Sequence, residues 1–150
     1  MPVEFKSLDH GMGMLFKGKG LLTGKELIDA LSEIYRLEEN TKEVKYVIAD
    51  YTCAECIDVS YDEIDIIAEK HKNAAKTTPD KVVAVVASKD ISFGLSRVWH
   101  AKLGDITWET TILRSKSEAE LWIKERVKTK FSIDVSEVLQ LLPEDQCQIN

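Results

Sequence analysis

The sequence predicts an α/β protein in which about four helices pack on a mixed β-sheet of about five strands. Apolar and polar residues alternate near the N-terminus as in a β-hairpin, and three later strand-like segments are each followed by a helix-like segment. The run VVAVVA at residues 82–87 has no polar alternation, which is typical of an internal strand covered on both faces. Together these patterns favour a hairpin followed by parallel strand–helix units.

The N-terminal region is predicted to be a hairpin followed by a helix. Residues 3–8 and 12–17 both alternate, and the Asp-His-Gly segment between them places Gly11 in the turn. The sequence Thr-Gly-Lys-Glu at residues 23–26 is a capping box, so a helix is expected to begin there and to run to about Leu37.

The middle of the chain contains two further strands and a second helix. Residues 44–49 (VKYVIA) read as a short strand, and residues 50–60 as a loop. A second capping box at residues 60–63 begins a helix, and the run at residues 82–87 follows as the internal strand. The buried stripe of that helix is expected to contain Ile64, Ile67, Ala68, His71 and Ala75.

The C-terminal part is predicted to add a helix, a strand and another helix. Asp90 is expected to cap the first helix, and Gly104 to end it. Residues 106–114 alternate as a strand does, and residues 117–120 form a third capping box. The inward-facing residues of the two helices are expected to be Leu95, Val98, Trp99 and Leu103, and then Ala119, Trp122, Ile123 and Val127.

The composition describes an ordinary soluble chain with one domain. Its 150 residues, 44% hydrophobic and 31% charged, are enough to bury a core without disulfides. The net charge of −6 argues against nucleic-acid binding, and no apolar run is long enough for a membrane helix. The N-terminus lacks the organisation of an export signal, so a cytoplasmic location is expected. We assign residues 1–130 to the domain and residues 131–150 to a C-terminal tail, with one short helix near residues 135–142.

Several segments resemble the SpoIIAA-like family of STAS-type domains in bacteria and archaea. They are VKYVIADYT (44–52), VVAVVAS (82–88), FGLSR (93–97) and ILRSKSEAELWI (112–123), within a similarity that covers residues 3–127. The resemblance implies a fold related to anti-sigma-factor antagonists and, more distantly, to the CRAL-TRIO lipid-binding fold. Antagonists carry a phosphorylatable serine at the start of the second helix. Ser60 retains that position, and the resemblance therefore makes Ser60, together with Thr52, the candidate phosphoswitch. The hydroxyl and the glycine that follow the serine in the antagonists are missing here.

The Cys-x-x-Cys pair, Cys53 and Cys56, offers a different function. A reactive thiol needs a nearby cation or helix N-terminus, but the expected helix begins several residues later and the surrounding side chains are acidic. A zinc site needs about four ligands, and the sequence has no second such pair. We therefore expect the cysteines to be incidental and keep thiol redox or metal binding as the alternative.

Polar residues at the strand ends and on the third helix define the candidate binding surface. Ligands of open α/β sheets bind beyond the carboxyl ends of the strands, next to helix N-termini. On the third helix, an aromatic, an arginine and a histidine fall on the face opposite the inward stripe. The predicted surface comprises Asp50, Thr52, Ser60, Lys89, Phe93, Arg97 and His100.

No catalytic triad, paired catalytic carboxylates, phosphate loop or metal-ligand motif is recognisable. We therefore expect a non-enzymatic binding or regulatory domain without a cofactor. Its partner is expected to be a protein or a small apolar or anionic ligand, and a homodimer is a further expectation.

Overall fold

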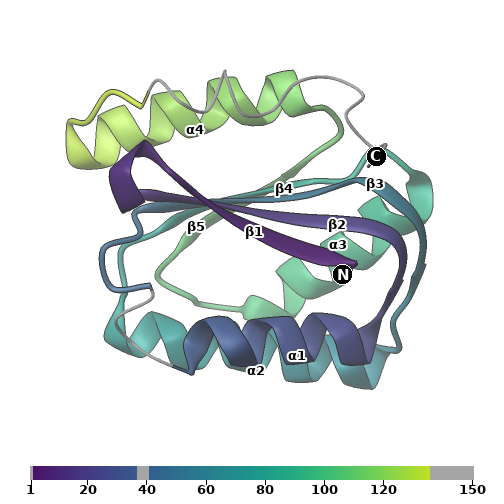
Figure 1. The fold of residues 1–150 in the computed structure, drawn as a ribbon. Coiled ribbons are helices and arrows are strands. Elements are labelled where there is room, and N and C mark those ends of the chain that lie inside the picture. Colours follow the sequence, from purple (N-terminus) through teal and green to yellow (C-terminus); the bar gives the residue numbers. More distant parts are fainter. Residues whose placement is uncertain (1, 37–40, 136–150) are drawn as a thin grey trace.

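A five-stranded sheet lies between two layers of helices in the computed structural model, which describes residues 2–36 and 41–135. Helix α4 covers one face of the sheet, and α1, α2 and α3 cover the other (Figure 1). The strands are β1 (Val3–Leu8), β2 (Gly13–Thr23), β3 (Tyr46–Asp58), β4 (Val82–Val86) and β5 (Glu109–Leu113). The helices are the 3-10 turn η1 (Asp9–Gly11), α1 (Gly24–Tyr35), α2 (Tyr61–Thr77), α3 (Asp90–Leu103) and α4 (Lys116–Phe131).

The strands follow one another across the sheet in the order β1-β2-β3-β4-β5. Strands β1 and β2 are antiparallel, and the other three pairs are parallel. All five residues of β4 are buried, and the strand lies between β3 and β5. The predicted mixed α/β sheet, its opening hairpin and its internal strand are therefore confirmed.

The hairpin turn is attached to the middle of the sheet. Asp9, His10 and Gly11 all have positive φ angles, of 46°, 56° and 91°. The Asp9 carboxylate accepts a hydrogen bond from the Tyr46 hydroxyl at the start of β3. A side chain at Gly13 would collide with the Tyr46 ring, so this glycine lets the two groups meet.

Two of the expected helix caps are confirmed and two are wrong. Thr23 and Ser60 both form complete capping boxes. The N-cap of α3 is Lys89 rather than Asp90, whose carboxylate instead pairs with the Arg114 guanidinium at 2.7 Å. The N-cap of α4 is Ser115 rather than the expected Ser117. Residues 115–118 also have a serine followed three positions later by a glutamate, and this earlier pattern follows directly after the end of β5.

The prediction of a loop at residues 50–60 is wrong. Strand β3 continues through Asp58, because β2 also continues to Thr23 and pairs with it well beyond the end of β4. The register shifts twice along this pair, which removes the regular alternation that identifies a strand. Strand β5, at Glu109–Leu113, is shorter than the predicted strand at residues 106–114.

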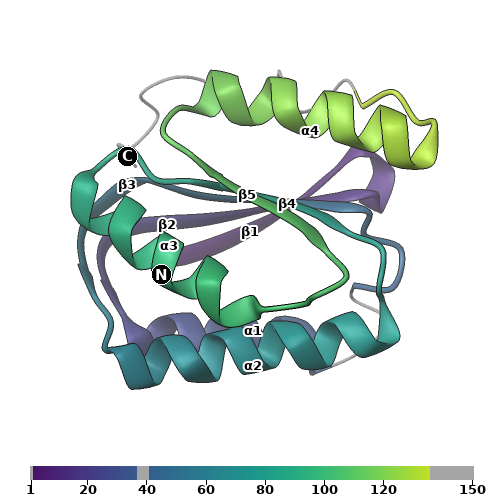
Figure 2. The ribbon, with the colours of Figure 1, turned by 180° about the vertical axis from the view of Figure 1, so that it is seen from behind.

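The extended β2–β3 pair curves towards the N-termini of α1 and α2 (Figures 1 and 2). Gly20 has a φ of +62°, and both register shifts lie close to it. A side chain at Gly18 would meet the end of the Leu22 side chain and the Tyr51 ring, so glycine lets these side chains pack against the strand here.

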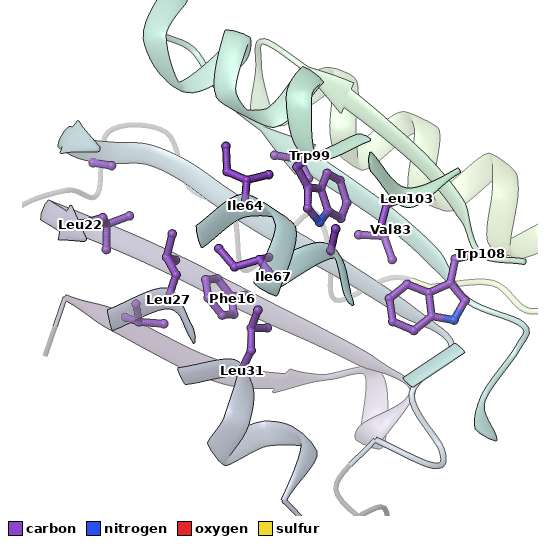
Figure 3. Packing of buried hydrophobic residues seen from close by; sticks show 14 of the residues in the cluster. Phe16, Leu22, Leu27, Leu31, Ile64, Ile67, Val83, Trp99, Leu103 and Trp108 are labelled. Atoms are coloured by element: carbon purple, nitrogen blue, oxygen red, sulfur yellow. The ribbon is translucent and has the colours of Figure 1, made fainter. Parts of the chain in front are cut away.

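The sheet separates two apolar cores. On the three-helix face, side chains of α1, α2 and α3 converge on β2 and β4 (Figure 3). On the α4 face, the core includes Ala119, Ile123 and Val127, as expected, and also Val135. The predicted helix near residues 135–142 lies outside the described residues apart from Val135.

Candidate ligand-binding cavity

An apolar cavity of about 120 Å³ lies between the sheet and the three-helix layer. Its floor is the face of β2, β3 and β4 that carries the odd-numbered residues of β3 and β4. Its roof consists of side chains from α1, α2 and α3, several of which Figure 3 labels. Among the lining residues are Phe16, Val47, Ala49 and Val83 on the floor, and Leu27, Leu31, Ile64 and Trp99 on the roof.

Small side chains leave this space open. Ala49 and Val47 lie on an internal strand beneath the helices, yet both are only partly buried. The inner face of α3 includes Ser92 and Ser96, which are 4% and 9% exposed. The inward stripe expected for α3 contained larger residues and neither serine. Their buried positions explain why α3 leaves part of the space above the sheet unfilled.

His71 joins two helices at the cavity wall. Its Nδ1 accepts a hydrogen bond from the Trp99 indole N–H at 2.9 Å, so the ring proton of the neutral imidazole lies on Nε2. Burial lowers the pKa of His71 to about 4, so the ring is neutral at pH 7. The rings of Tyr35 and Trp108 pack around it. The expected position of His71 on the inward stripe of α2 is confirmed.

Lys81 places a buried amino group beside the same cavity. The residue is 2% exposed, and its Nζ donates to the carbonyl oxygens of Thr41 at 2.8 Å and Val44 at 2.7 Å. Burial, and then the charge of Lys45, lower the pKa of Lys81 to about 8. Sequence reasoning missed this residue. Counting by twos from Val83 would have placed Lys81 on the cavity face.

The structure contradicts the expected surface position of Asp50. This residue is 1% exposed and follows Tyr46 and Ile48 on the face covered by α4. Its carboxylate accepts hydrogen bonds from the backbone N–H and hydroxyl of Thr52, and Lys116 lies 3.9 Å away. Alternation along β3 directs Asp50 into the interior, because the strand continues where a loop was expected.

The other expected surface residues do not all lie together. The Lys89 ammonium donates to the carbonyl oxygens of Thr52 at 3.2 Å and Ala54 at 2.8 Å, so Lys89 and Thr52 are neighbours. Ser60 lies beyond the far end of β3 and caps α2, and the extended backbone from Thr52 spans up to about 25 Å.

The α3 residues of the predicted surface follow Lys89 along the helix, and the Phe93 backbone N–H donates to the Lys89 carbonyl oxygen at 2.9 Å. Phe93 packs beneath the Arg114 guanidinium, 4.1 Å from the ring centre. Arg97 and His100 are exposed, and His100 Nδ1 lies 3.1 Å from the Thr110 hydroxyl. Whether Phe93, Arg97 and His100 contact a partner stays a prediction.

The two cysteines of the alternative hypothesis do not pair with each other. Cys53 is disulfide-bonded, whereas Cys56 is free and exposed. Within residues 2–36 and 41–135, no three histidine, cysteine or acidic side chains are arranged to hold a metal ion. In the same ranges, no helix combines the length and apolarity needed to cross a membrane.

The architecture defines the chain as an α/β protein with a SpoIIAA-like fold. It is similar to the crystal structure of an uncharacterized protein from the DUF3478 family, with a SpoIIAA-like fold, from Shewanella loihica PV-4. The two share 17% sequence identity with a TM-score of 0.50, over 80% of this chain and 90% of that chain. No family model and no curated protein matches the sequence. The resemblance in the sequence is therefore confirmed at the level of the fold.

Proposed function

We propose that this protein is a non-enzymatic binding domain that holds a small apolar molecule in the cavity between the sheet and the three-helix layer. The observation that carries the proposal is the cavity of about 120 Å³ and its largely aliphatic and aromatic wall. Small-molecule sites are typically concave and apolar, with a few polar groups that orient the ligand. The proposal moves the binding site from the carboxyl ends of the strands to one face of the sheet.

The energetics favour an occupant. Filling a fully enclosed apolar cavity of this volume is worth up to about 3 kcal/mol, because the lining atoms gain contacts, and this value is an upper bound for a cavity that is partly open. An apolar molecule that fills the space restores those contacts. An engineered apolar cavity of about 150 Å³ takes up benzene, so a ligand with about six carbons is of suitable size.

The chemistry of the wall supports binding more than catalysis. Nδ1 of His71 already accepts a hydrogen bond from the Trp99 indole N–H, so this nitrogen is not available as a general base. The Ser92 hydroxyl donates to the Lys89 carbonyl oxygen at 3.0 Å instead of to a base.

The test is a titration of ¹⁵N-labelled protein with 1-hexanol, followed through the indole N–H signals of its tryptophans. Trp99 lines the cavity, whereas Trp122 packs against the core beneath α4. We expect the Trp99 signal to move with a saturable dependence on 1-hexanol while the Trp122 signal stays in place. Equal movement of both signals, or none at saturation, would refute the proposal.

A matched pair of variants locates the ligand. Ala49→Leu fills the cavity from its floor, and Ala101→Leu adds the same atoms at an exposed position on α3. We expect Ala49→Leu to abolish the Trp99 response and Ala101→Leu to retain it. The free energy of unfolding of Ala49→Leu should equal or exceed that of the wild type, because the added atoms occupy an existing void.

A further inference from the structure

We propose that the ligand of this cavity is a short apolar monocarboxylate whose carboxylate group pairs with the ammonium group of Lys81. The inference rests on the proposed function and adds the chemical class of the ligand. It follows from the distribution of polar groups around the cavity and from the hydrogen bonding of Lys81.

The charged group of the wall, the Lys81 ammonium, lies at one end of the cavity. Lys81 immediately precedes β4, Thr41 lies in the segment that leads into β3, and Tyr35 is the last residue of α1. Towards the start of α2, the lining residues Ile57, Val59 and Ile64 are apolar. Ser92 and Ser96, which line the cavity from the first half of α3, are uncharged. A molecule that matches this cavity therefore has one polar head and an apolar body.

Within residues 2–36 and 41–135, two acceptors use two of the three N–H donors of the Lys81 ammonium group, which leaves one for that head. The two acceptors are the carbonyl oxygens of Thr41 and Val44. Both acceptors are neutral. Among the described residues that line the cavity there is no aspartate or glutamate, and the nearby charge that acts on Lys81 is the positive one of Lys45.

A buried cation without a counter-ion is costly, and an anionic ligand would remove much of that cost. The other titratable groups on the wall do not compete. Burial keeps His71 neutral at pH 7 and raises the pKa of Tyr35 and Tyr51 above their usual range. The lining side chains therefore contribute one positive charge at neutral pH, which matches a single carboxylate.

The experiment compares hexanoate with hexanamide, a neutral molecule of nearly the same shape. Both are titrated into ¹⁵N-labelled wild-type protein at pH 7 and followed through the Trp99 indole signal. We expect hexanoate to bind at least about tenfold more tightly than hexanamide. In Lys81→Met, which keeps most of the apolar stem, we expect the two affinities to become nearly equal.

The outcomes separate this inference from the proposed function. If neither molecule binds, the carboxylate assignment is overturned, and the titration with 1-hexanol decides whether the cavity site stands. If hexanamide binds as tightly as hexanoate to the wild type, the cavity site stands and the carboxylate assignment is overturned. A preference for hexanoate that survives in folded Lys81→Met would overturn the role of Lys81. The wild-type comparison decides the ligand class even if the variant fails to fold.

Discussion

The indole N–H of Trp99 donates to Nδ1 of His71 across 2.9 Å and so joins α3 to α2 at the wall of the cavity. The bond needs a neutral imidazole, because a doubly protonated ring has no acceptor nitrogen. The low pKa of His71 and its bond to Trp99 therefore have consequences for the stability of the fold in acid.

We predict that His71 contributes stability above pH 6.5 that is lost as the pH falls towards 4. Its pKa is about 4 in the folded protein and 6.5 for an unperturbed histidine, so between these values the unfolded chain binds the proton more strongly. The loss should amount to about 1–3 kcal/mol of unfolding free energy. Urea unfolding at pH 7 and pH 4.5 measures it.

The control for this prediction is His71→Gln, which can accept a hydrogen bond from Trp99 but does not titrate. The carboxylates of both proteins titrate alike, so the difference between their pH profiles isolates His71. Parallel profiles for the wild type and His71→Gln would contradict the prediction.

We predict that Ser115→Ala destabilises the protein by about 1 kcal/mol, because Ser115 caps α4 and accepts from the Glu118 backbone N–H. Ser117→Ala, inside the first turn, should change the unfolding free energy by no more than about 0.5 kcal/mol. Thermal or urea unfolding of the two single variants measures both effects. If Ser117→Ala destabilises the protein more than Ser115→Ala does, the N-cap is Ser117, as the sequence predicted.

The N-cap of α2 gives a related prediction for Ser60. Ser60→Ala should cost about 1 kcal/mol, because its side chain accepts from the Glu63 N–H. Ser60→Asp should retain wild-type stability, since aspartate caps equally well and its charge suits a helix N-terminus. Denaturant unfolding of both variants provides the comparison. If Ser60→Asp unfolds as readily as Ser60→Ala, negative charge is not accommodated here, and the predicted phosphoswitch loses support.

The contacts of Lys89 with β3 should also be measurable. We predict that Lys89→Met lowers the unfolding free energy by about 1–2 kcal/mol, because the carbonyl oxygens of Thr52 and Ala54 lose a charged donor. Arg97→Ala, at an exposed position of α3, should stay within about 0.5 kcal/mol of the wild type. Equal effects of the two substitutions would show that the Lys89 contacts contribute little.

Local signals predicted much of the fold. The capping boxes at Thr23 and Ser60 lie within four consecutive residues, so the sequence contains everything needed to recognise them. The apolar run at β4 identified an internal strand, because only a strand covered on both faces tolerates such continuous apolarity. The family resemblance predicted the SpoIIAA-like fold, and the similarity to a solved structure confirms it.

The candidate site was harder to predict, because its parts come from distant segments. The sequence itself determined the order of the elements, the mixed sheet and the two helix starts with capping boxes. Only the tertiary structure decided that β3 continues through Asp58, since β2 supplies the pairing partner. The same long-range packing buries Asp50 beneath α4 and places Lys81 beside a cavity formed by three helices. Caps and apolar runs depend on neighbouring residues, whereas strand extension, burial and cavities depend on contacts between segments that are far apart in the chain.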